Sequence, residues 1–156
     1  MLGIDIPGFG SVQLEHLVSD FTGTLSVDGE LLPEVKDLLN CTARIVKVHV
    51  VTADTFGTVR TALEGVECTL TVLAGEDIDA QKERYVKDLV PEHVIAIGNG
   101  NNDRLMLKAA RLGVAVIEGE GCSVIAVESA DIVVKSIQEG LNLLLHPKRV
   151  KATLRA

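Results

Sequence analysis

The sequence predicts an α/β protein with a Rossmann-like, doubly wound parallel sheet. Apolar segments of strand length alternate with helix-like segments of about ten residues along most of the chain, as in consecutive βαβ units. Apolar residues make up 47% of the chain and aromatic residues only 3%, so the core must be aliphatic, as suits parallel strands buried on both faces. A length of 156 residues without linker or repeat predicts a single domain, 1–156.

The expected elements follow in order from local signals. Residues 1–13 are a lead-in with a short strand at 4–6. Asp28-Gly29 between two apolar segments is typical of a hairpin turn, so a small β-flap should follow the first core strand. Pro33 suits the first turn of a helix and Gly113 suits a helix end. Core strands are expected at about 14–19, 45–51, 68–73, 94–97, 114–117 and 132–134, and helices at about 33–39, 55–63, 78–90, 105–113, 123–128 and 136–145.

Charge and composition limit the kinds of partner that the protein can bind and the cellular compartment in which it is expected. A formal net charge of −7 argues against a nucleic-acid-binding protein, which would need a basic face. No apolar segment approaches the roughly 18 residues of a membrane helix, and the N-terminus lacks the features of a signal peptide. A cytoplasmic protein without membrane contact is therefore expected. The scattered cysteines Cys41, Cys68 and Cys122 are expected to be buried, reduced thiols, and the basic tail at 147–151 a frayed end or a loosely docked helix.

Polar residues stand where successive strands should end. Asp20 follows the first core strand, Thr52 ends the second, and Asn102-Asp103 follows the fourth. Lys82 lies on the apolar face of a predicted helix, where it must either extend to water or meet an anion. Each has an ordinary explanation, a turn or helix cap for the aspartates and an extended side chain for Lys82. Their common place at the carboxyl edge of a parallel sheet nevertheless predicts a ligand site.

Gly98-Asn99-Gly100 raises the separate possibility of a dinucleotide-binding turn. The dinucleotide fingerprint requires a third glycine shortly afterwards, but Asn101-Asn102-Asp103 stands there instead. A nucleotide-binding module is therefore the weakest of the functions considered.

The chain resembles the haloacid dehalogenase superfamily, and specifically the catalytic core of a P-type ATPase made as a separate protein. The segment from Asp20 to Leu25, DFTGTL, is similar to the family motif D-x-[DT]-G-T-[LV], and GNGNND at 98–103 is similar to G-D-G-x-N-D. Thr52 fits the second family motif and Lys82 the third. The similarity covers about residues 14–135.

This resemblance implies a phosphatase or phosphotransferase that works through an aspartyl-phosphate on Asp20. The implied catalytic residues are Asp20, Thr22, Thr52 and Lys82. The implied phosphate-binding residues are Gly23, Thr52, Lys82 and Asn102. The implied cofactor is Mg²⁺, bound by Asp20, the Thr22 carbonyl, Asn99 and Asp103, because oxygen ligands suit this ion.

Two positions depart from the family pattern. Thr22 stands where phosphatases of the family carry an acid/base aspartate, whose loss typically costs about 10²–10⁴-fold in rate. Asn99 stands where an aspartate usually binds the metal, which removes one negative charge. A slow enzyme with weak metal binding is therefore expected. A catalytically impaired regulatory or interaction module with the same fold is the alternative.

The gaps between the motifs leave no room for a cap domain or for the nucleotide-binding domain of a transport ATPase. An open site suits a phosphorylated small molecule or a phosphorylated macromolecule, and it is compatible with a homo-oligomer formed through the flap.

Overall fold

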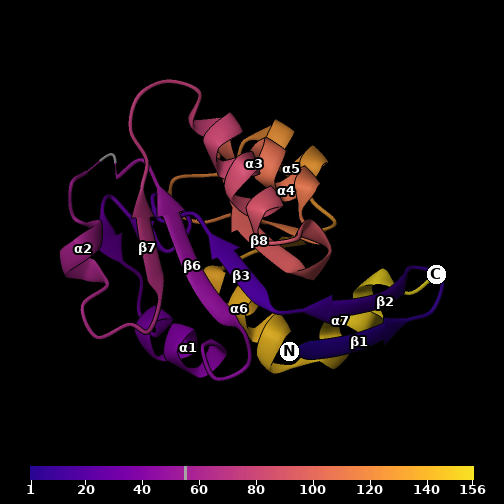
Figure 1. Ribbon diagram of the computed structural model, residues 1–156. Helices are drawn as coiled ribbons and strands as arrows, with labels where there is room; N and C mark the ends of the chain where they lie inside the picture. Colours follow the sequence, from indigo (N-terminus) through magenta and orange to yellow (C-terminus); the bar gives the residue numbers. More distant parts are fainter. Residues whose placement is uncertain (55) are drawn as a thin grey trace.

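The computed structural model describes residues 1–54 and 56–156, and a six-stranded, all-parallel sheet lies at its centre. The strand order is β10-β9-β8-β3-β6-β7, which is the doubly wound arrangement that the sequence predicts. Figure 1 shows α3, α4 and α5 gathered beside this sheet. The sheet strands are β3 (His16–Ser19), β6 (Lys47–Thr52), β7 (Thr69–Val72), β8 (Val94–Gly98), β9 (Leu112–Val116) and β10 (Ile132–Val134).

The helices cover the two faces of the sheet. They are α1 (Val35–Thr42), α2 (Val59–Ala62), α3 (Ile78–Asp88), α4 (Arg104–Ala109), α5 (Val124–Ser129), α6 (Ile137–Leu145) and α7 (Pro147–Leu154), with 3₁₀ turns at Pro91–His93 and Asn101–Asp103. No helix in the described part of the chain has the length and apolar character needed to cross a membrane.

Alternating side chains of the strands build two separate cores. In β6, Val48 and Val50 pack in the larger core with α1, α2 and α6, whereas Val51 joins the smaller core with α3, α4 and α5. Successive side chains of a strand point to opposite faces, so a sheet covered on both sides needs apolar residues in both registers. The aliphatic composition of the sequence meets that need. Because helices cover both faces of the sheet, the region open to a ligand lies at its end.

The carboxyl ends of β3, β6 and β8 meet at one edge because β3 pairs with both neighbours in parallel. The backbone N–H of Asp20 still donates to the carbonyl of Ile97 at 3.0 Å, which continues the ladder one residue past β3. Asp20, Thr52 and the loop after Gly98 are thereby brought to the same place, as predicted for strand ends in an open α/β sheet.

The expected lead-in and tail are more ordered than the sequence suggested. Strands β1 (Leu2–Ile6) and β2 (Gly10–Leu14) form an antiparallel hairpin, and α7 packs on it through the buried Val150. Figure 1 shows this hairpin and α7 together at one end of the molecule. The short strand predicted at 4–6 lies within β1, whereas β2 was missed because its pattern is short and follows Pro7 and Gly8. The tail is a docked helix.

Two predicted helices end earlier than expected. Helix α3 stops at Asp88 instead of Val90. Leu89 is its C-cap, and Val90, just before Pro91, has a positive φ of 63°, which a right-handed helix does not allow. Helix α4 stops at Ala109, and Gly113 lies inside β9 instead of ending the helix. A side chain at Gly113 would collide with the carbonyl of Leu107, so glycine here allows α4 to approach the sheet closely.

The helix expected at 55–63 is reduced to α2, and Thr55, its expected start, lies outside the described residues. The three cysteines are free thiols as predicted, but burial was wrong for Cys41, which is exposed on α1, while Cys68 and Cys122 are half-buried.

The predicted flap is present as β4 (Ser26–Val27) and β5 (Glu30–Leu31). Asp28 and Gly29 both have positive φ, as a two-residue hairpin turn of this kind requires. The flap is held on two sides. The Asp28 N–H donates to a Glu120 carboxylate oxygen at 3.1 Å, and the Thr58 hydroxyl donates to the Gly29 carbonyl at 2.7 Å.

Two histidines and a tyrosine form a hydrogen-bonded chain that links β3, β6 and α3, which no pattern in the sequence indicated. His16 Nδ1 lies 3.0 Å from His49 Nε2, and His49 Nδ1 lies 2.9 Å from the Tyr85 hydroxyl. Burial, then the neighbouring His16 and Lys47, lowers the pKa of His49 to about 4. The ring that accepts must be neutral, and the lowered pKa of His49 keeps that ring neutral at pH 7.

This network predicts an acid-sensitive contribution to stability. The pKa of His49 is lowered on folding, so its stabilisation is complete above about pH 6.5 and is lost as the pH falls towards 4. Urea denaturation should show about 2 kcal/mol lost between pH 7 and pH 5 through this residue. In His49→Gln that part of the loss should disappear, while His146→Gln, outside the network, should keep it. Equal losses in both variants would contradict the assignment.

Candidate active site

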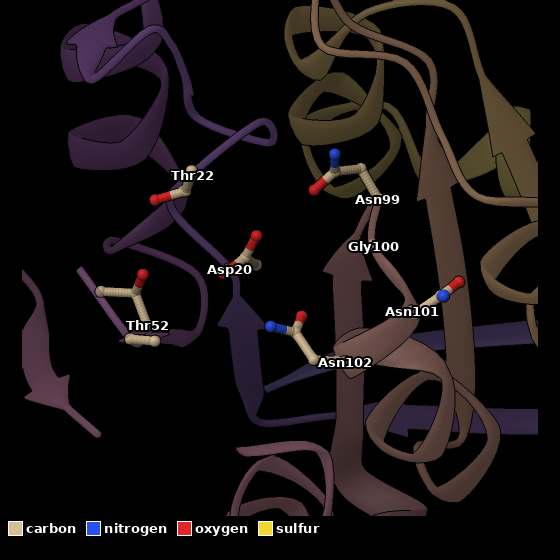
Figure 2. Close-up of a pocket in the computed structure, with 8 residues that line it drawn as sticks. Asp20, Thr22, Thr52, Asn99, Gly100, Asn101 and Asn102 are labelled. Atoms are coloured by element: carbon tan, nitrogen blue, oxygen red, sulfur yellow. The ribbon is translucent and has the colours of Figure 1, made fainter. Parts of the chain in front are cut away.

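A pocket of about 300 Å³ opens at the carboxyl edge of the sheet. It is lined by polar groups from three loops, those after β3, β6 and β8 (Figure 2). Thr22 and Thr52 lie on one side of Asp20, and Asn99 and Asn102 lie on the other. The lining residues are Asp20, Thr22, Thr52, Ala53, Asn99, Gly100, Asn101 and Asn102.

Behind the pocket, Lys82 lies between two buried carboxylates. Its ammonium is 2.8 Å from Asp20 Oδ1 and 2.7 Å from Asp103 Oδ1, and it lies 3.4 Å from Asn102 Oδ1. Lys82 is only 1% exposed and Asp103 is fully buried. Of the two possibilities for a lysine on an apolar helix face, the structure shows contact with anions.

The charges in this cluster shift the pKa values of Lys82 and Asp20. Burial alone would lower the pKa of Lys82, but the two carboxylates raise it above the ordinary lysine range. Burial, followed by the Asp103 charge, raises the pKa of Asp20 to about 6, and Lys82 opposes this rise. At neutral pH the lysine is charged and Asp20 is mostly ionised, so Asp20 is available as a nucleophile or as a ligand.

Asp103 organises the loop after β8 and does not line the pocket. Its Oδ2 accepts hydrogen bonds from the backbone N–H groups of Asn99 and Gly100, each at 2.9 Å, and its Oδ1 accepts from Lys82. Both oxygens are therefore engaged in holding Lys82 and the loop. The sequence predicts Asp103 as a metal ligand, and that remains a prediction; in the structure its carboxylate supports Lys82 and the loop after β8.

The hydroxyl groups of Thr22 and Thr52 differ in their hydrogen bonding. The Thr52 hydroxyl accepts from the Asp54 N–H at 3.1 Å, which leaves its proton free to donate into the pocket. The Thr22 Oγ1 is buried and has no hydrogen-bond partner among the described residues. A buried hydroxyl without a partner is costly.

Thr24 and the loop between β9 and α5 are site components that the sequence reasoning missed. The Thr24 hydroxyl lies 3.3 Å from Asp20 Oδ2 and 3.1 Å from Asn99 Oδ1, and Asn99 Nδ2 donates to the Gly121 carbonyl at 3.0 Å. Thr24 belongs to the DFTGTL segment, which could have indicated it. The glycines of Gly119-Glu120-Gly121, just after a strand end, were a further signal.

The donors in the pocket are oxygen atoms, which suit Mg²⁺ better than a softer metal. Within residues 1–54 and 56–156, no three His, Cys, Asp or Glu side chains gather closely enough to hold a metal by themselves. A divalent ion would therefore depend on one carboxylate, Asp20, with neutral oxygens beside it and with water or substrate completing its shell.

Removing the lysine charge tests the buried cluster. Lys82→Met would leave the two carboxylates without their shared counter-ion, which typically costs about 3–5 kcal/mol of unfolding free energy. The Asp20 pKa would then rise further above its unfolded value, so the variant should regain stability as the pH is lowered from 8 to 6. Urea denaturation at several pH values measures both effects.

The matched control is Lys87→Met on the same helix, where an exposed lysine pairs with Glu83 at 2.7 Å. That change should cost less than about 1 kcal/mol with little dependence on pH. Equal costs at the two positions would show that Lys82 does not balance the carboxylates.

Comparison with known proteins agrees with this geometry. A family model described as haloacid dehalogenase-like hydrolase matches residues 76–140. An uncharacterised protein of Methanocaldococcus jannaschii is 51% identical over 73 residues, which are 47% of this chain and 78% of that protein. A probable copper-transporting ATPase of Arabidopsis thaliana is 34% identical over 123 residues, 77% of this chain but only 12% of the ATPase.

Solved structures of low sequence identity share the fold. The cobalt-bound deoxy-D-mannose-octulosonate 8-phosphate phosphatase of Haemophilus influenzae superimposes with a TM-score of 0.72 at 12% identity, over 92% of this chain and 94% of that one. The 3-deoxy-D-manno-octulosonate 8-phosphate phosphatase of Moraxella catarrhalis, in complex with magnesium, phosphate and sugar, gives 0.66 at 18% identity, over 89% and 90%. Residues 76–140 thus resemble the haloacid dehalogenase-like hydrolases, and the solved phosphatase structures share the fold of the chain.

Proposed function

We propose that this protein is a Mg²⁺-dependent phosphatase or phosphotransferase that acts on phosphomonoesters through an aspartyl-phosphate on Asp20. The observation that carries the proposal is the position of Asp20. Its carboxylate opens into a polar pocket at the end of β3 while Lys82, 2.8 Å away, holds it from behind. A buried carboxylate fixed by a lysine, with polar groups around a pocket of about 300 Å³ that has room for a phosphate group, suits nucleophilic phosphoryl transfer.

The chain's own groups would each serve one part of this reaction. An Asp20 oxygen attacks phosphorus, the bond from phosphorus to the ester oxygen breaks, and that oxygen leaves with the electron pair and takes a proton. The Thr52 hydroxyl, the Asn102 amide and the backbone around Gly23 would hold the phosphoryl oxygens. Lys82 would offset the negative charge that gathers in the transition state. Water then releases phosphate from Asp20.

Mg²⁺ would be bound by the Asp20 carboxylate, the Thr22 carbonyl and the Asn99 amide oxygen. Its charge would draw the substrate phosphate into a protein of net charge −7. Asp103 would act from behind the pocket by holding Lys82 and the loop of Asn99, as its hydrogen bonds indicate. The magnesium in the Moraxella catarrhalis phosphatase supports the choice of ion.

The substrate is a phosphorylated small molecule or a phosphorylated group on a macromolecule. Between Asp20 and Thr52 the described chain adds only the flap and α1, so the pocket has no cap domain over it. The comparison phosphatases act on an octulosonate 8-phosphate, which favours a small sugar phosphate as the first substrate class to try. A homo-oligomer and a cytoplasmic location remain part of this proposal.

A catalytically impaired regulatory module is the second candidate, and Thr22 and Asn99 are the residues that favour it. Binding of a phosphate-like ligand alone does not separate the two candidates, because an impaired module could keep the anion site. Turnover separates them.

We expect slow, Mg²⁺-dependent hydrolysis of a generic aryl phosphate, with Asp20→Asn abolishing it. Thr22→Asp supplies the missing acid/base group and should raise the rate by about 10²-fold or more. Steady-state kinetics at 5–20 mM Mg²⁺, about the range that a weakly bound ion needs, would measure these effects.

A thermal-shift assay with Mg²⁺ and a phosphate-mimicking fluoride shows whether the site is formed, because a bound ligand raises the melting temperature. The shift should vanish in Asp20→Asn. A shift without turnover in either wild type or Thr22→Asp would select the regulatory module, and absence of both would reject the site.

A further inference from the structure

We propose that Asn99 is a positioning residue whose side-chain amide ties the aspartate loop, residues 20–26, to the loop between β9 and α5, residues 117–123. The proposal gives a reason for an amide at a position where related hydrolases carry an aspartate. Its relevance to catalysis rests on the function proposed above, but the tie itself does not.

The two ends of the amide contact different loops. The Oδ1 atom accepts a hydrogen bond from the Thr24 hydroxyl at 3.1 Å, and the Nδ2 atom donates to the Gly121 carbonyl at 3.0 Å. The Thr24 hydroxyl also lies 3.3 Å from Asp20 Oδ2, the carboxylate oxygen that Lys82 does not contact. Asn99 Oδ1 and Asp20 Oδ2 are both acceptors, so they share the single proton of the Thr24 hydroxyl. Through this shared donor, the amide links the surroundings of the nucleophile to a loop about 100 residues later in the chain.

The position of this amide is fixed by its surroundings. The backbone N–H of Asn99 donates to Asp103, and its carbonyl accepts from the Ser123 N–H at 2.8 Å. Gly23, with φ 76°, lies directly against the amide nitrogen, and a side chain at Gly23 would collide with it. The glycine of the DFTGTL segment therefore makes room for the amide as well as forming the turn.

An aspartate could not make the same tie. A carboxylate has no hydrogen to donate to the Gly121 carbonyl, so two oxygen atoms would face each other near 3 Å. It would also add a third negative charge beside Asp20 and Asp103, which share the single ammonium of Lys82. In the absence of a divalent ion, the amide is the better residue at this position.

The tie also reaches the flap. The loop that accepts from Asn99 carries Glu120, whose carboxylate accepts from the Asp28 N–H at the flap turn. Loosening the Gly121 contact should therefore free both the flap and the Thr24 hydroxyl that orients Asp20.

Hydrogen exchange in metal-free buffer without substrate tests the tie on its own. Asn99→Asp and Asn99→Ala should speed exchange of the backbone amides in 118–123 and 24–28 by about fivefold or more, the effect expected from losing one net hydrogen bond. Exchange in β9 should change less. Should Asn99→Asp fail to fold, the uncharged Asn99→Ala still decides the question.

The matched control is Asn101→Asp, which adds the same charge to the same loop and pocket. Figure 2 shows the Asn101 side chain pointing away from Asp20, and its side chain makes no hydrogen bond within the described part of the chain. This variant should keep wild-type exchange in both segments. Wild-type protection in Asn99→Ala, or equal loss in Asn101→Asp, would overturn the proposal.

Adding Mg²⁺ separates the effect of losing the amide hydrogen bonds from the effect of adding a negative charge. Raising Mg²⁺ from 0 to about 10 mM, a range suited to a weakly bound ion, should raise the melting temperature of Asn99→Asp more than that of wild type. It should not restore the protection of Asn99→Ala. Recovery of Asn99→Ala would show that the amide contacts are dispensable and would overturn the proposal. None of these measurements uses turnover, so a chain without phosphatase activity can still pass them.

Discussion

The structure of the site depends on one buried ammonium held between two carboxylates. Lys82 comes from α3, Asp20 from the end of β3 and Asp103 from the loop after β8, so the contact joins three segments that are far apart in the chain. A buried charge without its partner costs several kcal/mol, and none of the three can move away alone. The parallel order of β6, β3 and β8 brings their ends together, and the charges then fix the loops to within hydrogen-bond distance.

This arrangement limits how much further negative charge the pocket can hold. With Lys82 between Asp20 and Asp103, the cluster already has two carboxylates for one ammonium. Thr22 and Asn99, the two departures from the family pattern, are both neutral, and both lie at the pocket wall. Each removes a carboxylate that would otherwise need a divalent ion to balance it. The neutrality of these two side chains thus lowers the free-energy cost of forming the metal-free pocket.

The fold could be predicted from the sequence because its signals are local and repeated. Apolar segments alternating with helix-like segments predicted the sheet, and Asp28-Gly29 predicted the flap. The second strand of the N-terminal hairpin was missed because its pattern is short, and the end of α4 because Gly113 serves close packing instead of a helix stop. In the site, motif positions indicated Asp20, Thr52 and Lys82. Asp103's role in holding Lys82, the tie through Thr24 and Asn99, and the His16–His49–Tyr85 network depend on distances between segments, which spacing in one sequence cannot supply.

Within the described residues no cap domain covers the pocket, so under the proposed function the loops around the pocket would recognise the substrate. The flap is attached to the β9–α5 loop through Glu120 and to the segment before α2 through Thr58, on two sides of the same hairpin. Two direct hydrogen bonds to different segments favour a fixed wall over a lid that opens and closes. The phosphate would enter a preformed pocket, and the rest of the substrate would lie outside it, against these loops. Selectivity would then depend on contacts at the rim, and the chemical step on the Asp20, Lys82 and Asp103 cluster beneath it.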